Sequence, residues 1–514
     1  MAFQGSLLLG LFLLLTNVLV LIEVSLAANV PSHEITLPFN RTIFPSEFIF
    51  GASSSTYQYE GAWNEDGKGP SICDTFTHTH PEKILDHSNG DVALDFYHRY
   101  KDDLKLAKFE GLDAFRFSIS WTRILPHGKL SKGINQAGID HYNSLINEIV
   151  ALGIKPLATL FHWDVPQALE DDYLGFLSPK IVEDFLDFVE ICFKFFGDRV
   201  KLWSTMNEPW IFSVTGYDSG TLAPGRCSVW RNNNCSAGNS ATEPYTVSHN
   251  ILLAHAAAAK LYRQKYKPTQ KGEIGIILVS HWFEPFSNKP EDIRASRRAL
   301  DFMLGWLLHP LTYGDYPIIM KGLVGKRLPK FTPKESELVK GSFDFLGMNY
   351  YTSNFAAHLS SPLNTANVSF TTDNQVNQTT SRNGQLVGDP TGVSIFFVAP
   401  RGLYKLLLYI KKHYKNPKIY ITECGMGESN ITKVEEGVND IQRVDFYKRH
   451  IKALYEAFKE GVNVHGFFAW SFFDNFEWGS GYTQKFGINF IDYKNNLKRY
   501  PKKSALWMKR FLLK

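Results

Sequence analysis

Two glutamates in this sequence have the setting of residues that could do chemistry together. Glu208 lies in the segment TMNEP and Glu423 in the segment ITECG, each at the end of a short apolar run. Two carboxyl groups that face one sugar carbon can break a glycosidic bond, because one protonates the leaving oxygen while the other attacks or directs water. The chain has no H-E-x-x-H or similar metal spacing at a strand end and no G-x-S-x-G elbow. We therefore expect carboxylate chemistry with no metal and no other cofactor.

Polar residues recur at the C-terminal ends of eight apolar runs. They are Gln58 and Glu60, Arg116, His162 and Asp164, Asn207 and Glu208, His281 and Glu284, Asn349 and Tyr351, Glu423, and Glu477 after Trp470. Any one of them could be structural, such as half of a buried ion pair for Arg116 or a core histidine for His162. The C-terminal strand ends of a barrel face one rim, so the whole set is better explained by one pocket. Neighbouring aromatic residues suit the apolar face of a pyranose and an aromatic aglycone.

The apolar runs alternate with amphipathic stretches along the chain. The runs cover 47–55, 112–120, 155–163, 200–208, 272–280, 344–352, 417–425 and 464–472, and helical patterns cover 91–110, 138–152, 179–196, 244–266, 291–324, 400–414 and 440–460. This alternation predicts an α/β fold, a single (β/α)8 TIM barrel with long βα loops forming the mouth of the site. An open doubly wound sheet would require a Gly-rich phosphate turn, which the sequence lacks. The irregular stretch 353–393 follows the sixth run and is expected to lie over the mouth.

The N-terminus carries a separate pattern. An apolar run at 7–22 is followed by Ser25-Leu26-Ala27, which places small residues where a signal peptidase would cut. We predict a signal peptide at 1–27 and a catalytic barrel domain at 28–514. A membrane anchor is the alternative, but the run is short for a span and has no flanking Lys or Arg cluster. The mature protein is expected in the secretory pathway, either apoplastic (extracellular) or vacuolar, without membrane contact after cleavage.

Other features agree with secretion. Cys227 and Cys235 flank the polar loop CSVWRNNNC at a spacing suited to one local disulfide, with two free thiols as the alternative. Candidate N-glycosylation sites are Asn40, Asn234, Asn367, Asn377 and Asn430. The net charge of +4 is small for 514 residues and its cations are scattered, so nucleic acid is not an expected partner. The sequence yields no prediction of the oligomeric state.

The motifs of this chain resemble those of glycoside hydrolase family 1, and within it the plant β-glucosidases. The resemblance extends from Phe44 to Leu513. It rests on FIFGASSSTYQYEGAWNEDGKGPSICD, FRFSISWTRILP, LFHWDVPQAL, TMNEPW, GMNYYTS, YITECG and GFFAWSFFDNFEWGSGYTQKFGINFIDY.

The resemblance implies a role for each matched residue. Glu208 would be the general acid/base and Glu423 the nucleophile, with Arg116 keeping Glu423 ionised. An apolar wall and the charge of Glu423 should raise the pKa of Glu208. Asn207 would bind the sugar 2-hydroxyl and Tyr351 would lie beside the nucleophile. The other glucose-binding residues would be Gln58, His162, Trp470, Glu477 and Trp478.

Three features bear on departures from the family pattern. Cys424 stands where the family usually has Asn after the nucleophile; we expect it to be tolerated, a reactive thiol being the alternative. A count back from Pro400 places Ile395 where an aglycone-contacting Trp is usual. Myrosinase-like members lack the acid/base glutamate, and the presence of Glu208 argues against a thioglucosidase.

The function expected from the resemblance is retaining hydrolysis of β-D-glucosides of small plant metabolites by double displacement. A disaccharide-specific β-glycosidase or a transglucosidase of the same family is the alternative. A non-enzymatic, sugar-binding barrel would be expected to lack one of the two glutamates, and both are present. The identity of the aglycone does not follow from the sequence.

Overall fold

The computed structural model describes residues 39–359 and 367–513. The chain divides into an N-terminal part that ends at Ile43 and a compact unit from Phe44 onwards. In the first part the only described element is the 3-10 turn Arg41–Ile43. The predicted signal peptide at 1–27 lies outside the described residues. No helix of the described residues has the length and apolar character needed to cross a membrane.

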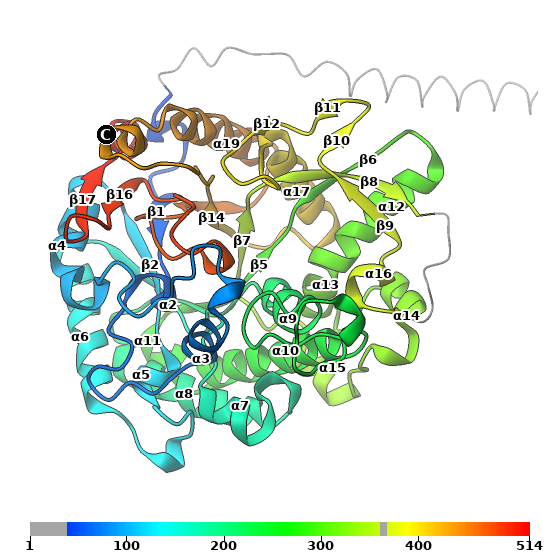
Figure 1. Cartoon of the computed structure of the whole chain (residues 1–514), viewed down its shortest axis with the longest axis horizontal. Helices are drawn as coiled ribbons and strands as arrows, with labels where there is room; N and C mark the ends of the chain where they lie inside the picture. The colour runs from blue at the N-terminus through cyan, green and yellow to red at the C-terminus, as the bar shows by residue number, and fades with distance from the viewer. Residues whose placement is uncertain (1–38, 360–366, 514) are drawn as a thin grey trace, which may run out of the picture. The chain divides into compact units, whose positions relative to one another are not determined.

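Eight parallel strands of the compact unit form a closed barrel, as predicted (Figure 1). In chain order they are β1 (Ile49–Ser53), β2 (Ala114–Ser118), β3 (Lys155–Thr159), β4 (Leu202–Asn207), β5 (Glu273–Val279), β7 (Phe345–Tyr350), β14 (Ile419–Cys424) and β15 (Val464–Ala469). Each of the eight predicted runs contains one of these strands. The barrel closes where β1 pairs with β15 on one side and with β2 on the other. All eight C-terminal ends therefore face the same rim.

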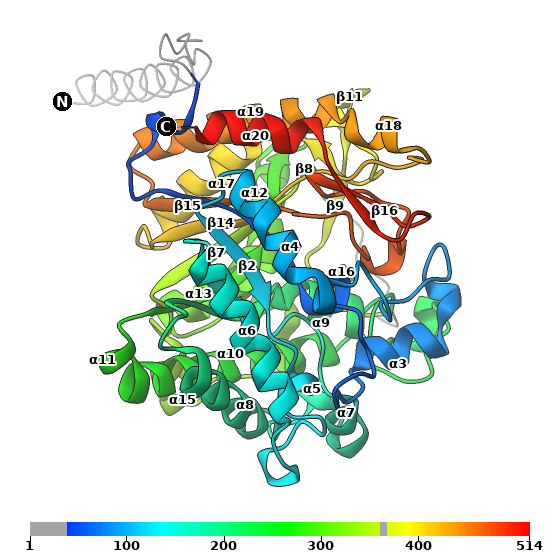
Figure 2. The same ribbon diagram turned by 90° about the vertical axis from the view of Figure 1, so that its left-hand side faces the viewer.

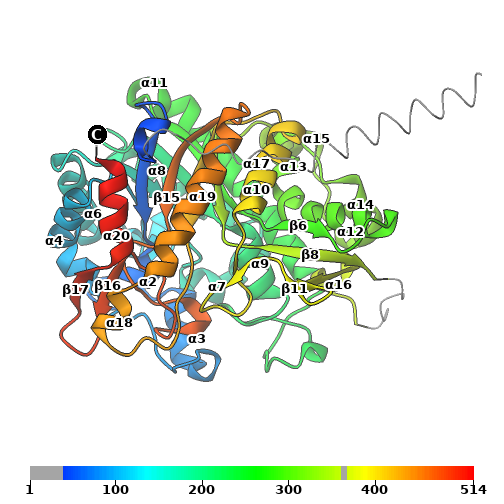
Figure 3. The ribbon, with the colours of Figure 1, turned by 90° about the horizontal axis from the view of Figure 1, so that it is seen from above.

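The main helices follow the barrel strands along the chain, the last of them after β15. They are α4 (Phe96–Phe109), α6 (Gln136–Ala151), α8 (Ile181–Phe196), α10 (Glu243–Leu261), α12 (Pro290–Leu300), α13 (Trp306–Tyr313), α17 (Pro400–His413), α19 (Ile441–Lys459) and α20 (Lys503–Leu512). Figure 2 shows α4 and α6 on the outside of the barrel beside β2, and Figure 3 shows α17 and α19 side by side. The remaining α-helices are α2 (Thr56–Tyr59), α3 (Ile72–Thr79), α5 (Trp121–Ile124), α7 (Gln167–Tyr173), α9 (Pro209–Tyr217), α11 (Lys267–Gln270), α14 (Ile318–Val324), α15 (Pro333–Val339), α16 (Phe370–Asp373) and α18 (Val434–Val438).

The helix α8 shows how the sequence pattern produces this layer. Phe185, Phe188, Cys192 and Phe196 are fully buried, and their spacing of three and four residues places them on one face of the helix. The Phe188 ring stacks on Trp121 at 5.3 Å between centroids. Polar residues cover the opposite face, so the helix is fixed on the barrel by its apolar side.

Two expectations about local structure were wrong. The pattern at 291–324 is not one helix, because α12 passes into a π turn, Asp301–Gly305, and α13 ends at Gly314, which has a φ of 86°. The stretch 353–393 is not irregular. It contributes β8 (Ser353–His358), β9 (Val376–Thr379), β10 (Ser381–Arg382), β11 (Gln385–Leu386) and β12 (Asp389–Pro390), and these pair with one another, with β6 (Trp282–Pro285) or with β13 (Phe397–Val398). These strands lie together at the upper right of Figure 1.

One layer of side chains fills the barrel interior. Ile49, Ala114, Leu157, Phe345, Tyr420 and Phe468 form a buried cluster, with Leu202 packed against it. Strands β1 and β7 are not neighbours in the barrel, yet Ile49 and Phe345 belong to this one cluster, so the cluster extends across the interior. A Cβ at Gly51 would lie 2.5 Å from the Phe468 ring, so this glycine makes room for the ring. A further small sheet, β16 (Asn489–Asp492) with β17 (Lys498–Pro501), follows β15.

A buried acid at the end of α4 yields the first prediction. Glu110 is fully buried, and burial raises its pKa to about 8. In the unfolded chain a Glu pKa is about 4.3, so the folded state disfavours ionisation and stability falls as pH rises from about 4 through 8. Glu110→Gln should therefore raise the free energy of unfolding at pH 7 by about 1–3 kcal/mol. Denaturation midpoints at pH 4.5 and pH 7.5 test this, since the gain should shrink at the lower pH; an equal gain at both would contradict it.

Candidate active site

A cavity of about 370 Å³ opens at the C-terminal rim of the barrel. This volume lies within the range of about 300–1,000 Å³ usual for ligand sites. Its walls are His162, Trp163, Asn207, Glu208, Trp210, Ile211, Thr215, Leu222, Val279, His281, Tyr351, Ile395, Phe396, Glu423, Trp470, Glu477, Trp478 and Phe486. Six of the barrel strands, from β3 onwards, and the loops that follow them thus bring most of the predicted site residues to one place.

Glu208 follows directly on β4 and precedes α9. Its backbone has a φ of 45°, a left-handed conformation that is strained for a residue with a side chain. The side chain lines the cavity, and Asn349 Nδ2 donates a hydrogen bond to its Oε1 over 2.6 Å. Burial, and secondly the neighbouring Glu423 carboxylate, raise the pKa of Glu208 to about 8. This carboxyl group is therefore protonated at neutral pH and can donate a proton.

Glu423, on β14, has the opposite surroundings. Arg116 Nη1 donates to Oε1 in a buried ion pair, and the Tyr351 hydroxyl donates to Oε2 over 2.5 Å. Arg116 is fully buried and also donates to Asn207 Oδ1 over 2.7 Å and to Thr159 Oγ1 over 3.1 Å. One guanidinium thus joins β2 to β3, β4 and β14. These two hydrogen bonds fix the position of the Glu423 carboxyl group.

A second group of polar side chains lies at the end of β15 and in the loop after it. Gln58 Nε2 donates to Asn475 Oδ1 and to the Phe476 carbonyl, both over 2.8 Å, and approaches Glu477 Oε2 at 3.4 Å. Trp470 Nε1 donates to Glu477 Oε1 over 3.3 Å. Burial raises the pKa of Glu477 to about 8. Glu477 and Trp470 thus present a carboxyl group and an indole to the cavity, while the fully buried Gln58 holds the loop that carries Glu477.

His162 and Asn207 connect the two groups. Asn207 Nδ2 donates to His162 Nε2 over 3.2 Å, so the proton of the neutral ring is on Nδ1. Burial, and then Arg116, hold the pKa of His162 well below its usual range. The His162 ring lies nearly parallel to those of Trp470 and Trp478, at 6.1 and 6.0 Å. These flat faces surround space of the kind that a pyranose fills.

Six of the polar residues expected at the rim are absent from the cavity wall. Gln58, Arg116 and Asn349 lie directly behind it and bond to the wall residues Glu477, Glu423 and Glu208, whereas Glu60, Asp164 and Glu284 have other partners. Glu60 forms a buried ion pair with Arg123 at 2.7 Å, and Glu284 pairs with Lys405. Asp164 accepts a hydrogen bond from Thr56 Oγ1 over 3.2 Å. For these three residues the structural reading is correct, because each is satisfied by a partner outside the cavity.

The outer wall of the cavity is apolar. Ile395 lines it and is 61% exposed, in line with the count back from Pro400. Phe396 stacks on Tyr351 at 5.4 Å, and Phe486 lies edge-on to the same ring. Sequence reasoning missed Phe396 and Phe486 as wall residues, although the first is adjacent to Ile395. It also missed Leu222, which comes from a loop without a recognisable motif.

Cys424 does not reach the cavity. Its side chain is fully buried, and burial raises the pKa of the thiol well above its ordinary value. A buried thiol with a raised pKa is a poor nucleophile. The structure therefore agrees with a tolerated packing residue and not with a reactive thiol.

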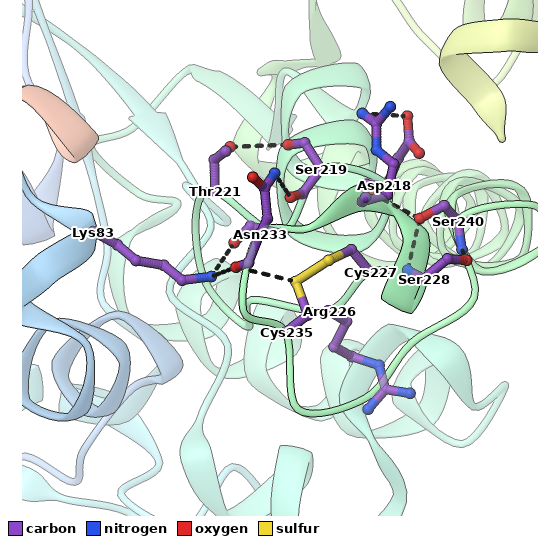
Figure 4. The surroundings of a disulfide bond; sticks show 12 residues. Lys83, Asp218, Ser219, Thr221, Arg226, Cys227, Ser228, Asn233, Cys235 and Ser240 are labelled. Carbon is purple, nitrogen blue, oxygen red and sulfur yellow. Dashed lines mark hydrogen bonds and ion pairs between the residues drawn. A yellow bond between two sulfur atoms is a disulfide. The ribbon is translucent and has the colours of Figure 1, made fainter. Parts of the chain in front are cut away.

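The predicted disulfide joins Cys227 to Cys235, with the Cα atoms 5.6 Å apart. Figure 4 shows the closed loop and Lys83 reaching into it, where Nζ donates to the carbonyls of Gly220 and Asn233 over 2.8 Å. A Cβ at Gly220 would lie 2.1 Å from Cys235 Sγ, so the loop packs tightly on the disulfide. The disulfide thus supports the segment that brings Leu222 to the cavity.

The five candidate glycosylation sites all have accessible side chains. Asn234, Asn377 and Asn430 are exposed, and Asn40 and Asn367 are half-buried.

Within the described residues, no group of three or more His, Cys, Asp or Glu side chains has an arrangement that could hold a metal ion.

Comparison with known proteins identifies the family. The model of glycosyl hydrolase family 1 matches residues 40–514. Beta-glucosidase 12 of Oryza sativa subsp. indica is 56% identical over 504 residues, 98% of each chain, and furcatin hydrolase of Viburnum furcatum is 58% identical over 467 residues, 91% of this chain and 86% of that one.

Solved structures agree. Rice Os3BGlu6 β-glucosidase has a TM-score of 0.91 and 48% identity, covering 93% of this chain and all of its own. A family 1 β-glucosidase of the fungus Humicola insolens, in complex with glucose, has a TM-score of 0.88 and 42% identity, covering 91% of this chain and 98% of its own. The chain belongs to glycosyl hydrolase family 1.

Proposed function

We propose that this retaining β-glucosidase uses Glu208 as its general acid/base and Glu423 as its nucleophile. The observation that carries the assignment is the asymmetry of their surroundings. Glu423 is paired with Arg116 and Tyr351, which favour the anion, whereas Glu208 is buried beside a neutral amide and has a raised pKa. A proton donor and an anionic nucleophile are the two groups that a retaining mechanism needs.

In the first step Glu208 donates its proton to the glycosidic oxygen while Glu423 attacks the anomeric carbon. The aglycone leaves as an alcohol and the sugar is joined to Glu423 as an ester. Glu208, now a carboxylate, then takes a proton from water as the water oxygen attacks the same carbon. Glucose is released with its configuration retained, and both glutamates return to their initial protonation states.

The glucose is proposed to bind between Trp470, Trp478 and the polar groups of Gln58, His162, Asn207 and Glu477. Substrates are proposed to be β-D-glucosides of small plant metabolites. Support comes from the apolar outer wall, which suits an apolar aglycone, and from relatives such as a furostanol glycoside 26-O-beta-glucosidase, 55% identical. NMR monitoring of the hydrolysis of 4-nitrophenyl β-D-glucoside tests this function. The glucose should be released with retained configuration.

The pH dependence of kcat/KM follows from the raised pKa of Glu208. This group is protonated below its pKa of about 8, so kcat/KM should fall as pH rises through this value. It should also fall in acid, where Glu423 becomes protonated, which gives a bell whose optimum lies on the acid side of neutral and whose limbs belong to the coupled pair. The control is 2,4-dinitrophenyl β-glucoside, whose good leaving group should weaken the alkaline limb. A flat profile from pH 4 to 9 would contradict the mechanism.

Ile395→Trp should shift aglycone preference toward flat aromatic groups. A Trp face can stack on an aryl ring with a gain of about 0.5–1.5 kcal/mol, which the branched Ile side chain cannot provide. The ratio of kcat/KM on 4-nitrophenyl β-glucoside to that on a bulky alicyclic β-glucoside should rise several-fold. Ser394→Trp is the matched control, because this exposed neighbour is absent from the cavity wall. An unchanged ratio in Ile395→Trp would contradict the aglycone role.

Entry into the secretory pathway is part of the proposal, with the apoplast or the vacuole as destination. The disulfide and the accessible sequons support it. A fusion of residues 1–27 to a fluorescent protein tests the signal: the fusion should leave the cytosol, and retention there would contradict it.

A further inference from the structure

A second cavity lies against the proposed aglycone side of the first. It has a volume of about 280 Å³, and its walls are Trp210, His281, Phe283, Ala299, Phe302, Met303, Phe370, Thr371, Asn374, Val376 and Gln378. Trp210 and His281 line both cavities, so these two side chains form the boundary between them. We call this space the side chamber. None of its walls is a residue to which the proposed mechanism gives a task.

His281 presents a hydrogen-bond acceptor at this boundary. Burial lowers its pKa to about 4, so the ring is neutral, and Nδ1 donates to Asn354 Oδ1 over 2.9 Å. The other ring nitrogen, Nε2, is therefore unprotonated and has no partner among the described residues. The backbone N–H of His281 is also held, by the sulfur of Met303 at 3.3 Å. The ring is thus fixed with one open acceptor.

The opposite wall supplies amide groups. Val376 and Gln378 both line the chamber, whereas Asn377 between them does not, as the alternation of side chains along β9 requires. Gln378 is exposed, and its side-chain amide bonds to none of the described residues. Asn374 uses Oδ1 to accept from the backbone of Val376 over 3.0 Å, which leaves Nδ2 as a donor.

Aromatic rings complete the chamber. Trp210 is held by a hydrogen bond from Nε1 to the Phe302 carbonyl over 3.2 Å, and its ring lies edge-on to Phe370 at 6.0 Å. Phe370 is fixed in turn by stacking on Trp306 at 4.5 Å. Fixed rings with open amide and imidazole groups beside them can pack on the C–H face of a pyranose while binding its hydroxyls.

We propose that the side chamber binds a second sugar, one that is attached to the aglycone and not to the glucose that is cleaved. The proposal rests on the proposed function, in which glucose binds beside Glu423. The preferred substrates would be glucosides of an apolar aglycone that carries a further sugar at another position. The apolar wall would hold the aglycone, and the amides of the side chamber would hold the distal sugar. A solely apolar aglycone would leave these amides and the His281 acceptor unused.

The test compares substrates that differ by one sugar. Hydroquinone and resorcinol bis-β-glucosides are each compared with the corresponding monoglucoside. The kcat/KM of each bis-glucoside is divided by two, because that substrate has two equivalent glucosidic bonds. At least one bis-glucoside should exceed its monoglucoside by about five- to tenfold, mainly through a lower KM, as expected for one or two added hydrogen bonds. 4-Nitrophenyl β-glucoside reports the basal activity separately, so loss of that activity would count against the proposed function instead.

Variants test whether the gain in kcat/KM on the bis-glucosides depends on the side chamber. Gln378→Leu should lower it to twofold or less while kcat/KM on 4-nitrophenyl β-glucoside stays unchanged. Asn377→Leu, made without N-glycans, is the matched control, because it removes an amide from the opposite face of the same strand. Ala299→Phe fills the chamber and should abolish the gain. The proposal is overturned if neither bis-glucoside shows a gain, or if the gain persists in Gln378→Leu.

Discussion

With azide present, Glu423→Gly should convert β-glucosyl fluoride into a glucosyl azide of the α configuration. Removal of the side chain leaves space on the α face, and azide can attack there in place of the carboxylate. In Glu208→Ala the glucosyl-enzyme still forms from a substrate with a good leaving group, and azide then attacks from the β face to give the β-azide. The configuration of each product, read by NMR, assigns the two roles.

The rate losses of the two variants test the roles of Glu208 and Glu423 independently. Without the acid, kcat/KM should fall by about 10²–10⁴-fold on glucosides with poor leaving groups and much less on 2,4-dinitrophenyl β-glucoside, because only a basic leaving oxygen needs the proton. Without the nucleophile, the loss should be large for both substrates. Azide products of the reverse configurations would exchange the roles of Glu208 and Glu423.

Arg116→Met should lower kcat/KM by about 10²–10³-fold, because this is the usual cost of removing one preorganised charge-stabilising donor from a reacting group. The change leaves Glu423 without its cation and Asn207 without the donor that orients it. The protonated form of the nucleophile is then favoured, so the acid limb of the pH profile should move to higher pH. Initial rates on 4-nitrophenyl β-glucoside from pH 4 to 9 measure both effects.

Arg123→Met is the matched control for this change. Arg123 is as deeply buried as Arg116 and pairs with Glu60 at 2.7 Å, but it donates to the carbonyls of Gly61 and Ala62 where Arg116 donates to Glu423 and Asn207. It should lower the unfolding temperature and leave both kcat/KM of the folded fraction and the acid limb close to those of the original chain. If both variants move the acid limb equally, Arg116 acts only through stability.

The barrel could be predicted from the sequence because its strands are short apolar runs whose polar ends coincide. Burial on both faces makes each run nearly continuous in apolar residues, a pattern that survives without knowledge of the partners. The strands at 353–393 could not be predicted in this way. β9 and β12 are rich in polar residues, and what makes them strands is pairing with distant segments, such as that of β9 with β8 and of β12 with β13.

The residues around the two glutamates could be predicted for a related reason. The end of a barrel strand fixes where the side chain that follows it lies. The same rule misplaced Glu60 and Glu284, because position along the chain does not show that Arg123 or Lys405 is nearby. The outer wall was least predictable. Leu222 and Phe486 reach it from loops, where tertiary packing and not local pattern sets the direction of each side chain.

The pairing of β1 with β15 has a consequence for synthesis on the ribosome. Gln58 bonds to Asn475, 417 residues further along, so the proposed glucose-binding group is assembled from the two ends of the compact unit. A growing chain exposes Glu208 early but has neither Glu423 nor Glu477 until almost all of it has been made. Incomplete chains, or chains truncated before β15, would thus have no hydrolytic activity, and a cell that stores glucosides would be protected from the enzyme until its translation is finished.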